Sequence, residues 1–204
     1  MPKIKLTKGE LKRQRDALRQ YERYLPMLQL KKQQLQQEIL RLSETLQDRR
    51  HRQAREHEAA QRWAGLLTDP HHQMREWLRA REIHKGVRNV AGVNLPVFEE
   101  ARFGEVSYDL FLTPLWVDAG LPALRRLAAL REEIRVLEET DRILREELRV
   151  TTQRVNLFEK VKIPAAQEAI RIIKIYIGDQ MANAVGRSKI AKRKIETLMH
   201  EVAA

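Results

Sequence analysis

Cysteine is absent from this chain, and aromatic residues make up only 5% of its 204 residues. Without cysteine the chain can form no disulfide and offers no thiolate as a metal ligand or nucleophile. A reducing compartment fits this absence. No apolar run approaches the roughly 20 residues that a membrane-spanning helix needs, and Met1–Lys5 lacks the apolar stretch of a signal peptide. We therefore expect a soluble protein with no direct membrane span.

Residue patterns that carry enzymatic or cofactor chemistry are also missing. None of the eight glycines precedes Lys-Ser or Lys-Thr, and no two have the spacing that opens a dinucleotide-binding loop. His71 and His72 are adjacent and have no evident third ligand, which favours a surface or capping role over a metal site. Paired glutamates such as Glu138 and Glu139 point apart on a helix and indicate a solvated face. The sequence thus predicts no catalytic, cofactor-binding or metal-binding residue.

Charged residues, by contrast, are abundant and unevenly distributed. They make up 33% of the chain, and the net charge is +11. Residues 1–60 carry +7 and residues 160–204 carry +5, whereas residues 61–159 carry −1. The high charge and the few glycines and prolines are typical of long helices rather than of a sandwich or barrel. The two basic ends need a functional explanation.

The N-terminal segment contains a seven-residue repeat that runs for more than five heptads. Spacings that alternate between three and four keep these side chains on one narrow face of a helix, which requires a partner helix. Pro26 removes a backbone hydrogen bond and costs roughly 3 kcal/mol inside a helix. Because the repeat continues through Leu28 and Leu35, we expect a kink at Pro26 and not an end. The repeat positions are Leu11, Leu18, Leu25, Lys32, Ile39 and Leu46 in one set and Gln14, Tyr21, Leu28, Leu35 and Leu42 in the other.

A second heptad segment begins near Leu127. Asp141 and Thr151 are its polar exceptions. After Pro164 an apolar stripe resumes at helical spacing, and several small residues before Val185 predict close packing against a partner helix. The heptad positions are Leu127, Ile134, Asp141, Leu148 and Val155 in one set and Leu130, Leu137, Leu144, Thr151 and Phe158 in the other. The later stripe consists of Ile170, Ile173 and Ile177. The small residues are Ala165, Ala166, Ala169, Gly178, Ala182 and Ala184.

The residues between the two heptad segments differ from both. Residues 87–98 are rich in valine, residues 106–112 alternate apolar and polar side chains, and residues 100–104 resemble a turn, so we expect a β-hairpin near residues 87–112. The predicted fold is all-α: a long antiparallel two-helix coiled coil with a small central insertion of short helices and this hairpin. The predicted bounds are 1–60 for the long N-terminal helix, 61–122 for the insertion and 123–204 for the long C-terminal helix.

Antiparallel pairing would bring both basic ends to one tip. Three explanations of this tip are about equally supported by the residues alone: a solubilising surface, a nucleic-acid phosphate-binding surface, or a surface that sits inside a protein ring of complementary charge. The candidate interface residues are Lys8, Lys12, Arg187, Lys189, Lys192, Arg193 and Lys194.

Three segments resemble one family in the right order along the chain. Residues 154–164, which read RVNLFEKVKIP, are similar to the Arg-Val-Asn-Ala-Leu-Glu…Ile-Pro signature of the D subunits of V/A-type ATP synthases. Residues 27–35 (MLQLKKQQL) and residues 90–96 (VAGVNLP) resemble two further segments of that family. Residues 178–186 depart from it, because they are nearly uncharged where the family usually carries an acidic run.

The resemblance implies a non-catalytic, cytoplasmic central-stalk subunit, peripheral to the membrane. Such a shaft couples ATP synthesis or hydrolysis to proton or sodium transport. Its implied partners are the catalytic hexamer, which receives the tip, a small central-stalk subunit, and the membrane rotor ring through a connecting subunit, with no nucleic acid. The alternative is a basic coiled-coil protein that binds nucleic acid or acts as a scaffold. Salt-dependent retention on DNA would distinguish the two.

Overall fold

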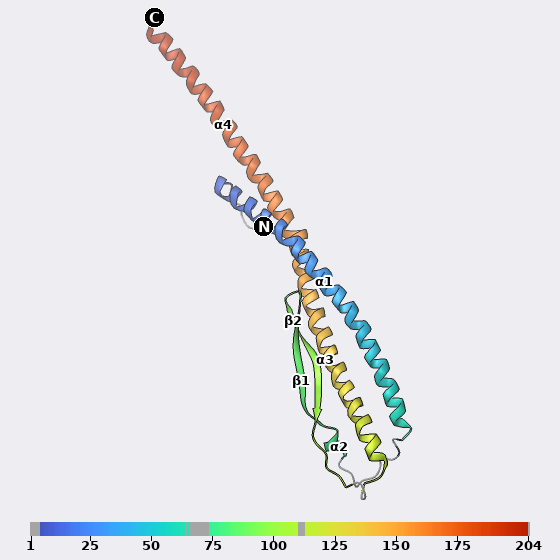
Figure 1. Cartoon of the computed structure of the whole chain (residues 1–204). Coiled ribbons are helices and arrows are strands. Elements are labelled where there is room, and N and C mark those ends of the chain that lie inside the picture. The colour runs from blue at the N-terminus through green and yellow to red at the C-terminus, as the bar shows by residue number, and fades with distance from the viewer. Residues whose placement is uncertain (1–4, 64, 66–73, 110–112, 204) are drawn as a thin grey trace. The chain divides into compact units, whose positions relative to one another are not determined.

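The computed structural model describes residues 5–63, 65, 74–109 and 113–203. Its elements are α1 (Lys8–Gln61), α2 (Met74–Trp77), β1 (Ala80–Val90), β2 (Val93–Phe103), α3 (Trp116–Leu157), the π-helix η2 (Phe158–Lys162) and α4 (Ile163–Ala203) (Figure 1). They form two compact units. Unit 1 comprises Met1–Gln29 and Thr152–Ala204, and unit 2 comprises Leu30–Thr151.

In unit 2, α1 and α3 pair in antiparallel orientation. Lys31 Nζ lies 2.8 Å from Glu147 Oε1, while Arg49 Nε lies 2.6 Å from Glu133 Oε1, so the residue number falls along α3 as it rises along α1. Between the helices lies one apolar core. It contains Leu35, Leu42, Leu46, Leu95, Leu130, Ile134 and Leu144. The predicted antiparallel two-helix fold is confirmed.

The heptad predictions agree with the observed burial. Every predicted repeat position from Leu11 to Leu46 is buried or half-buried, including the polar Gln14 and Lys32. The same holds for the second set from Leu127 to Phe158, in which Thr151 is almost fully buried. α1 continues through Pro26, which is exposed, so this proline does not end the helix. An exposed proline leaves the freed carbonyl of the preceding turn accessible to water, which lowers the cost of the missing hydrogen bond.

The β-hairpin exists, but its predicted position is wrong. The strands pair in antiparallel fashion from Ala80 opposite Phe103 to Val90 opposite Val93. Ala91 and Gly92 form the turn with φ angles of 51° and 79°, the two positive values of a type I′ turn. Residues 100–103, predicted as a turn, belong to β2, residues 106–109 form no strand, and residues 110–112 lie outside the described part of the chain.

The hairpin packs on the paired helices of unit 2 (Figure 1). Leu95 is 1% exposed and lies in the core. Thr140 Oγ1 on α3 donates a hydrogen bond to the Pro96 carbonyl at 2.8 Å, and Arg88 forms an ion pair with Glu38 on α1. Because a two-stranded hairpin is marginal alone, these contacts explain why it is ordered here.

In unit 1 the first part of α1 pairs with η2 and the start of α4. The ring centroids of Tyr21 and Phe158 are 5.3 Å apart. On α4, Ala166, Ala169, Ile170 and Ile173 are buried. The prediction of close packing by small residues therefore holds for Ala166 and Ala169. It fails for Ala165, Gly178, Ala182 and Ala184, which are exposed.

Candidate partner-binding surfaces

The last part of α4 presents a surface that no described residue covers. Every residue from Gly178 to Met199 is exposed. Several of these side chains are large and apolar, although exposed apolar groups on soluble proteins usually occur singly. They are Met181, Val185, Ile190, Ile195, Leu198 and Met199, with exposed fractions from 52 to 69%. Such a concentration is typical of a surface that another protein covers.

Five of the predicted interface cations lie on this same stretch: Arg187, Lys189, Lys192, Arg193 and Lys194, all of them exposed. An α-helix turns by about 100° per residue, so these five side chains spread over about 220° of the helix circumference and do not share one face. Lys192 lies 3.8 Å from Glu196, in a pair that is mostly exposed and therefore contributes little to stability. A partner that contacts all five cations has to extend around more than half of the helix.

The other two predicted interface residues, Lys8 and Lys12, are exposed at the start of α1. Tyr21 and Phe158 set the register of unit 1. Lys12 therefore lies level with about residue 167, which is roughly 30 Å from Arg187 at 1.5 Å per residue. The expectation that both basic clusters meet at one tip is thus wrong. α4 extends past the start of α1, as Figure 1 shows, and carries its own cluster.

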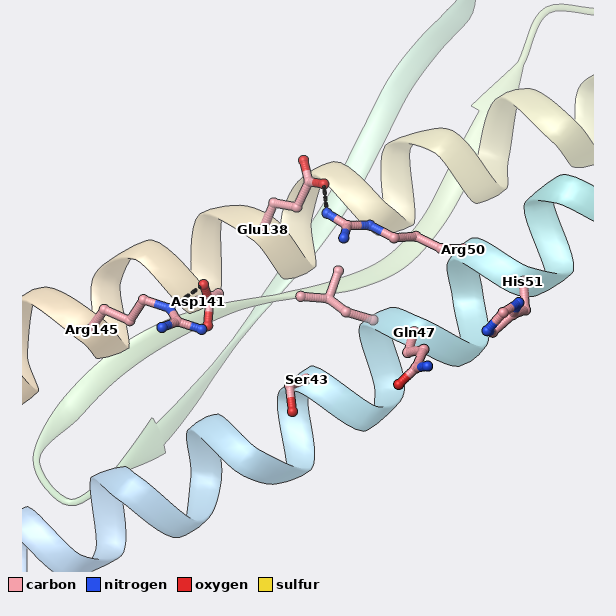
Figure 2. Close-up of a pocket in the computed structure, with 8 residues that line it drawn as sticks. Ser43, Gln47, Arg50, His51, Glu138, Asp141 and Arg145 are labelled. Carbon is pink, nitrogen blue, oxygen red and sulfur yellow. Dashed lines mark hydrogen bonds and ion pairs between the residues drawn. The ribbon is translucent and has the colours of Figure 1, made fainter.

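A groove in unit 2 collects polar residues from both paired helices (Figure 2). Arg50 donates a 2.7 Å hydrogen bond to Glu138, and Arg145 Nε donates a 2.6 Å hydrogen bond to Asp141 Oδ2. The bond from Arg145 to Asp141 raises the pKa of the arginine. The groove has a volume of about 550 Å³ and is lined by Ser43, Leu46, Gln47, Arg50, His51, Glu138, Asp141 and Arg145. Both carboxylates of the groove, Glu138 and Asp141, thus accept a hydrogen bond from an arginine.

The adjacent glutamates of α3 have partners that sequence reasoning missed. Glu133, Glu138 and Glu147 form ion pairs with α1, and Glu139 pairs with Lys85 of the hairpin at 3.1 Å. From the sequence, these paired glutamates were predicted to lie on a solvated face. No local signal marks an ion pair between residues 54 to 116 positions apart; only the antiparallel pairing itself brings them together. These carboxylates connect α3 to α1 and to the hairpin.

His71 and His72 lie outside the described residues. Within the described ranges, no three His, Asp or Glu side chains are placed to bind a metal ion. No helix among these residues is both long and apolar enough to cross a membrane.

Comparison with known proteins identifies the family. The family of ATP synthase D subunits matches residues 10–193. The V-type ATP synthase D subunit of Borreliella burgdorferi is 40% identical over 195 residues, which cover 96% of each chain. The protein of the same name from Chlamydia felis is 34% identical over 202 residues, 97% of this chain and 96% of its own. That from Chlamydia pneumoniae is 32% identical over 195 residues, 95% and 93% of the two chains. The family match and these three relatives extend over nearly the full length, so this chain belongs to the family of ATP synthase D subunits.

Proposed function

We propose that this chain is the central-stalk shaft of a V/A-type ATP synthase or ATPase. It couples ATP synthesis or hydrolysis in a catalytic hexamer to proton or sodium transport. The observation that carries the proposal is the uncovered end of α4, with exposed apolar side chains and cations on all sides of one helix. Family membership supports it, because three relatives are named as subunits of a V-type ATP synthase.

The α4 end suits insertion into a ring of subunits. A ring can contact every side of a single helix, cover its apolar residues and supply acidic groups to its cations. A nucleic-acid duplex would contact one face only and would leave Met181, Ile195 and Met199 in water. The distribution of side chains therefore favours an enclosing protein over the nucleic-acid alternative.

The paired helices suit transmission of torque. Within unit 2 the helices are connected by a continuous apolar core and by cross-helix ion pairs such as Arg49–Glu133. Two helices that interlock along a seam resist twisting better than one, because rotation of either displaces packed side chains. We assign the shaft to residues 1–60 and 123–204, and we assign binding of the small central-stalk subunit and of the ring connector to the insertion at 61–122.

Catalysis belongs to the hexamer in this proposal. The carboxylates of α3 that face α1 and the hairpin are neutralised by arginine or lysine partners, so this chain supplies torque and not a reacting group. It works at the cytoplasmic side of the membrane as a peripheral subunit of the complex.

Charge reversal at the α4 end tests the proposal. The triple variant Lys192→Glu, Arg193→Glu and Lys194→Glu should lower ATP hydrolysis by the reconstituted complex at least tenfold or prevent assembly on gel filtration. A matched triple variant in unit 2, Arg52→Glu, Arg55→Glu and Arg142→Glu, should do neither. Equal activity and assembly in both would contradict insertion of the α4 end. Salt-sensitive retention of the parent chain on duplex DNA would favour the nucleic-acid alternative.

A further inference from the structure

The seam of unit 1 changes phase at the π-helix. Seam residues Val155 and Phe158 are buried and half-buried. An uninterrupted heptad pattern would continue with Lys162, Ala165, Ala169, Ile172 and Tyr176. The structure instead buries or half-buries residues that each lie one position later in the chain. They are Ile163, Ala166, Ile170, Ile173 and Ile177.

The extra residue of the π-helix produces this shift. The backbone N–H of Ile163 bonds to the carbonyl of Phe158, five residues earlier, instead of the four of an α-helix. One additional residue in a turn advances all later side chains by one position, and one position corresponds to about 100° of rotation. The π-helix therefore keeps the Ile173 stripe facing α1.

The positions that are skipped form a second apolar stripe. Ala165, Ala169, Ile172 and Tyr176 follow the uninterrupted heptad spacing; Ala169 is already buried beside Ile170, whereas Ile172 and Tyr176 are 37% and 40% exposed. Lys162 is their polar member, and the methylenes of a lysine can lie on a seam while its ammonium stays in water. α4 thus carries two apolar stripes, offset by one residue, and the N-terminal part of α1 can cover one of them at a time.

We propose that α4 pairs with the N-terminal part of α1 in two registers and that the π-helix switches between them. With the π-helix present, the Ile173 stripe faces α1. When its extra residue is absorbed into regular α-helix, the Ile172 stripe faces α1, and the uncovered end of α4 has rotated by about 100° with its cations. Packed helices change between discrete arrangements of this kind, on a timescale of microseconds to milliseconds. The proposal concerns this chain alone and does not depend on the shaft function.

Thiol labelling of the full chain tests the two registers, because the chain has no cysteine of its own. Ala165→Cys reports on the second register, since Ala165 is exposed now and would enter the seam. Gln167→Cys is the matched control and stays exposed in both. Introducing Ile173→Gln and Ile177→Gln weakens the first register. The labelling rate of Ala165→Cys should then fall at least tenfold relative to Gln167→Cys, with helical content by circular dichroism retained.

Two outcomes of this experiment would overturn the proposal. One is equally fast labelling at both positions after the double substitution, which would mean that the Ile172 stripe does not pair with α1 and awaits another protein. The other is loss of helical content, because a second register should preserve the pairing.

Deletion of Lys160 provides an independent measurement. It removes the extra residue, so the Ile173 stripe should remain in the seam within a regular α-helix, and the melting temperature should not fall. Deletion of the exposed Arg142 in the regular part of α3 should lower the melting temperature, because it displaces every later seam residue. With Lys160 deleted, the double glutamine substitution should no longer slow labelling of Ala165→Cys. Equal destabilisation by the two deletions would show that the π-helix does not shift the heptad pattern by one residue, and it would contradict the proposed switch.

Discussion

Unit 2 and the far end of α4 contain the same kinds of residues and use them differently. In unit 2, leucines at heptad spacing lie between two helices and a hairpin, and Leu35 and Leu144 are fully buried. At the end of α4, Ile195 and Leu198 occur at similar spacing and are more than half exposed. A helical stripe of apolar residues therefore shows that a partner is required, but not whether the partner belongs to the same chain.

Truncation of apolar side chains should separate the two regions most strongly. Leu144→Ala should lower the free energy of unfolding by about 2–5 kcal/mol, because it leaves a cavity in the core of unit 2. Ile195→Ala should lower it by less than about 0.5 kcal/mol, because the side chain is already in water. Urea unfolding of the isolated chain measures both. A comparable loss for Ile195→Ala would mean that the α4 end packs on its own chain.

The heptad pattern made most of unit 2 predictable from sequence. Its seam positions depend on local spacing, and an antiparallel pairing of two stripes follows from a turn-rich segment between them. The hairpin was misplaced because Ala91-Gly92 lacks the Asn-Gly or Asp-Gly pattern that marks a type I′ turn. Asn89 compensates, since its Oδ1 accepts a hydrogen bond from the Gly92 N–H at 3.1 Å. That interaction follows from the turn geometry and is not evident from composition.

The residues of the candidate surface stood out in the sequence, but their layout along the helices did not. Clustered cations after Arg187 were evident in the sequence. Their separation from Lys8 and Lys12 was not evident, because heptad spacing does not indicate where one helix extends beyond the end of its partner. The π-helix had a sequence signal, since Ile170, Ile173 and Ile177 resume the stripe one position out of phase with Phe158. The cross-helix ion pairs had no such sequence signal.

A buried hydrogen bond gives the next largest expected difference. Thr140 is 7% exposed, and its hydroxyl lies within hydrogen-bond distance of the carbonyl oxygens of Pro96 at 2.8 Å and Val136 at 3.0 Å. Thr140→Val should cost about 1–2 kcal/mol, because the Pro96 carbonyl loses its partner inside the structure. Thr197→Val on the exposed α4 end removes a bond to Arg193 and should change the free energy of unfolding negligibly. Equal effects of the two would show that the hairpin is not held by Thr140.

Ion pairs should give a smaller contrast. Arg49→Gln removes a cross-helix bond to Glu133 between side chains that are 36% and 24% exposed, and should cost about 0.5–1 kcal/mol at low salt. Arg171→Gln removes an exposed pair within one helix and should be silent in the same assay. Adding about 0.5 M salt should shrink the Arg49 effect through screening. An Arg49 effect that grows with salt would point to lost packing of its methylenes instead of lost charge.

The smallest expected effect is a pH dependence at Glu146. The hydrogen bond from Arg149 lowers the pKa of this carboxyl below its ordinary value. A carboxyl whose folded-state pKa is depressed stabilises the fold above its unfolded pKa, and this contribution is lost as the pH falls through the folded pKa. Both side chains are 59% exposed, so solvent screening makes the contribution small. Melting curves of the parent and of Glu146→Gln should therefore coincide at neutral pH within error, and any difference between them should disappear as the pH is lowered below about 4. A clear loss of stability at neutral pH would mean that α3 depends on this pair, and the distinction between structural cross-helix pairs and dispensable local ones would fail.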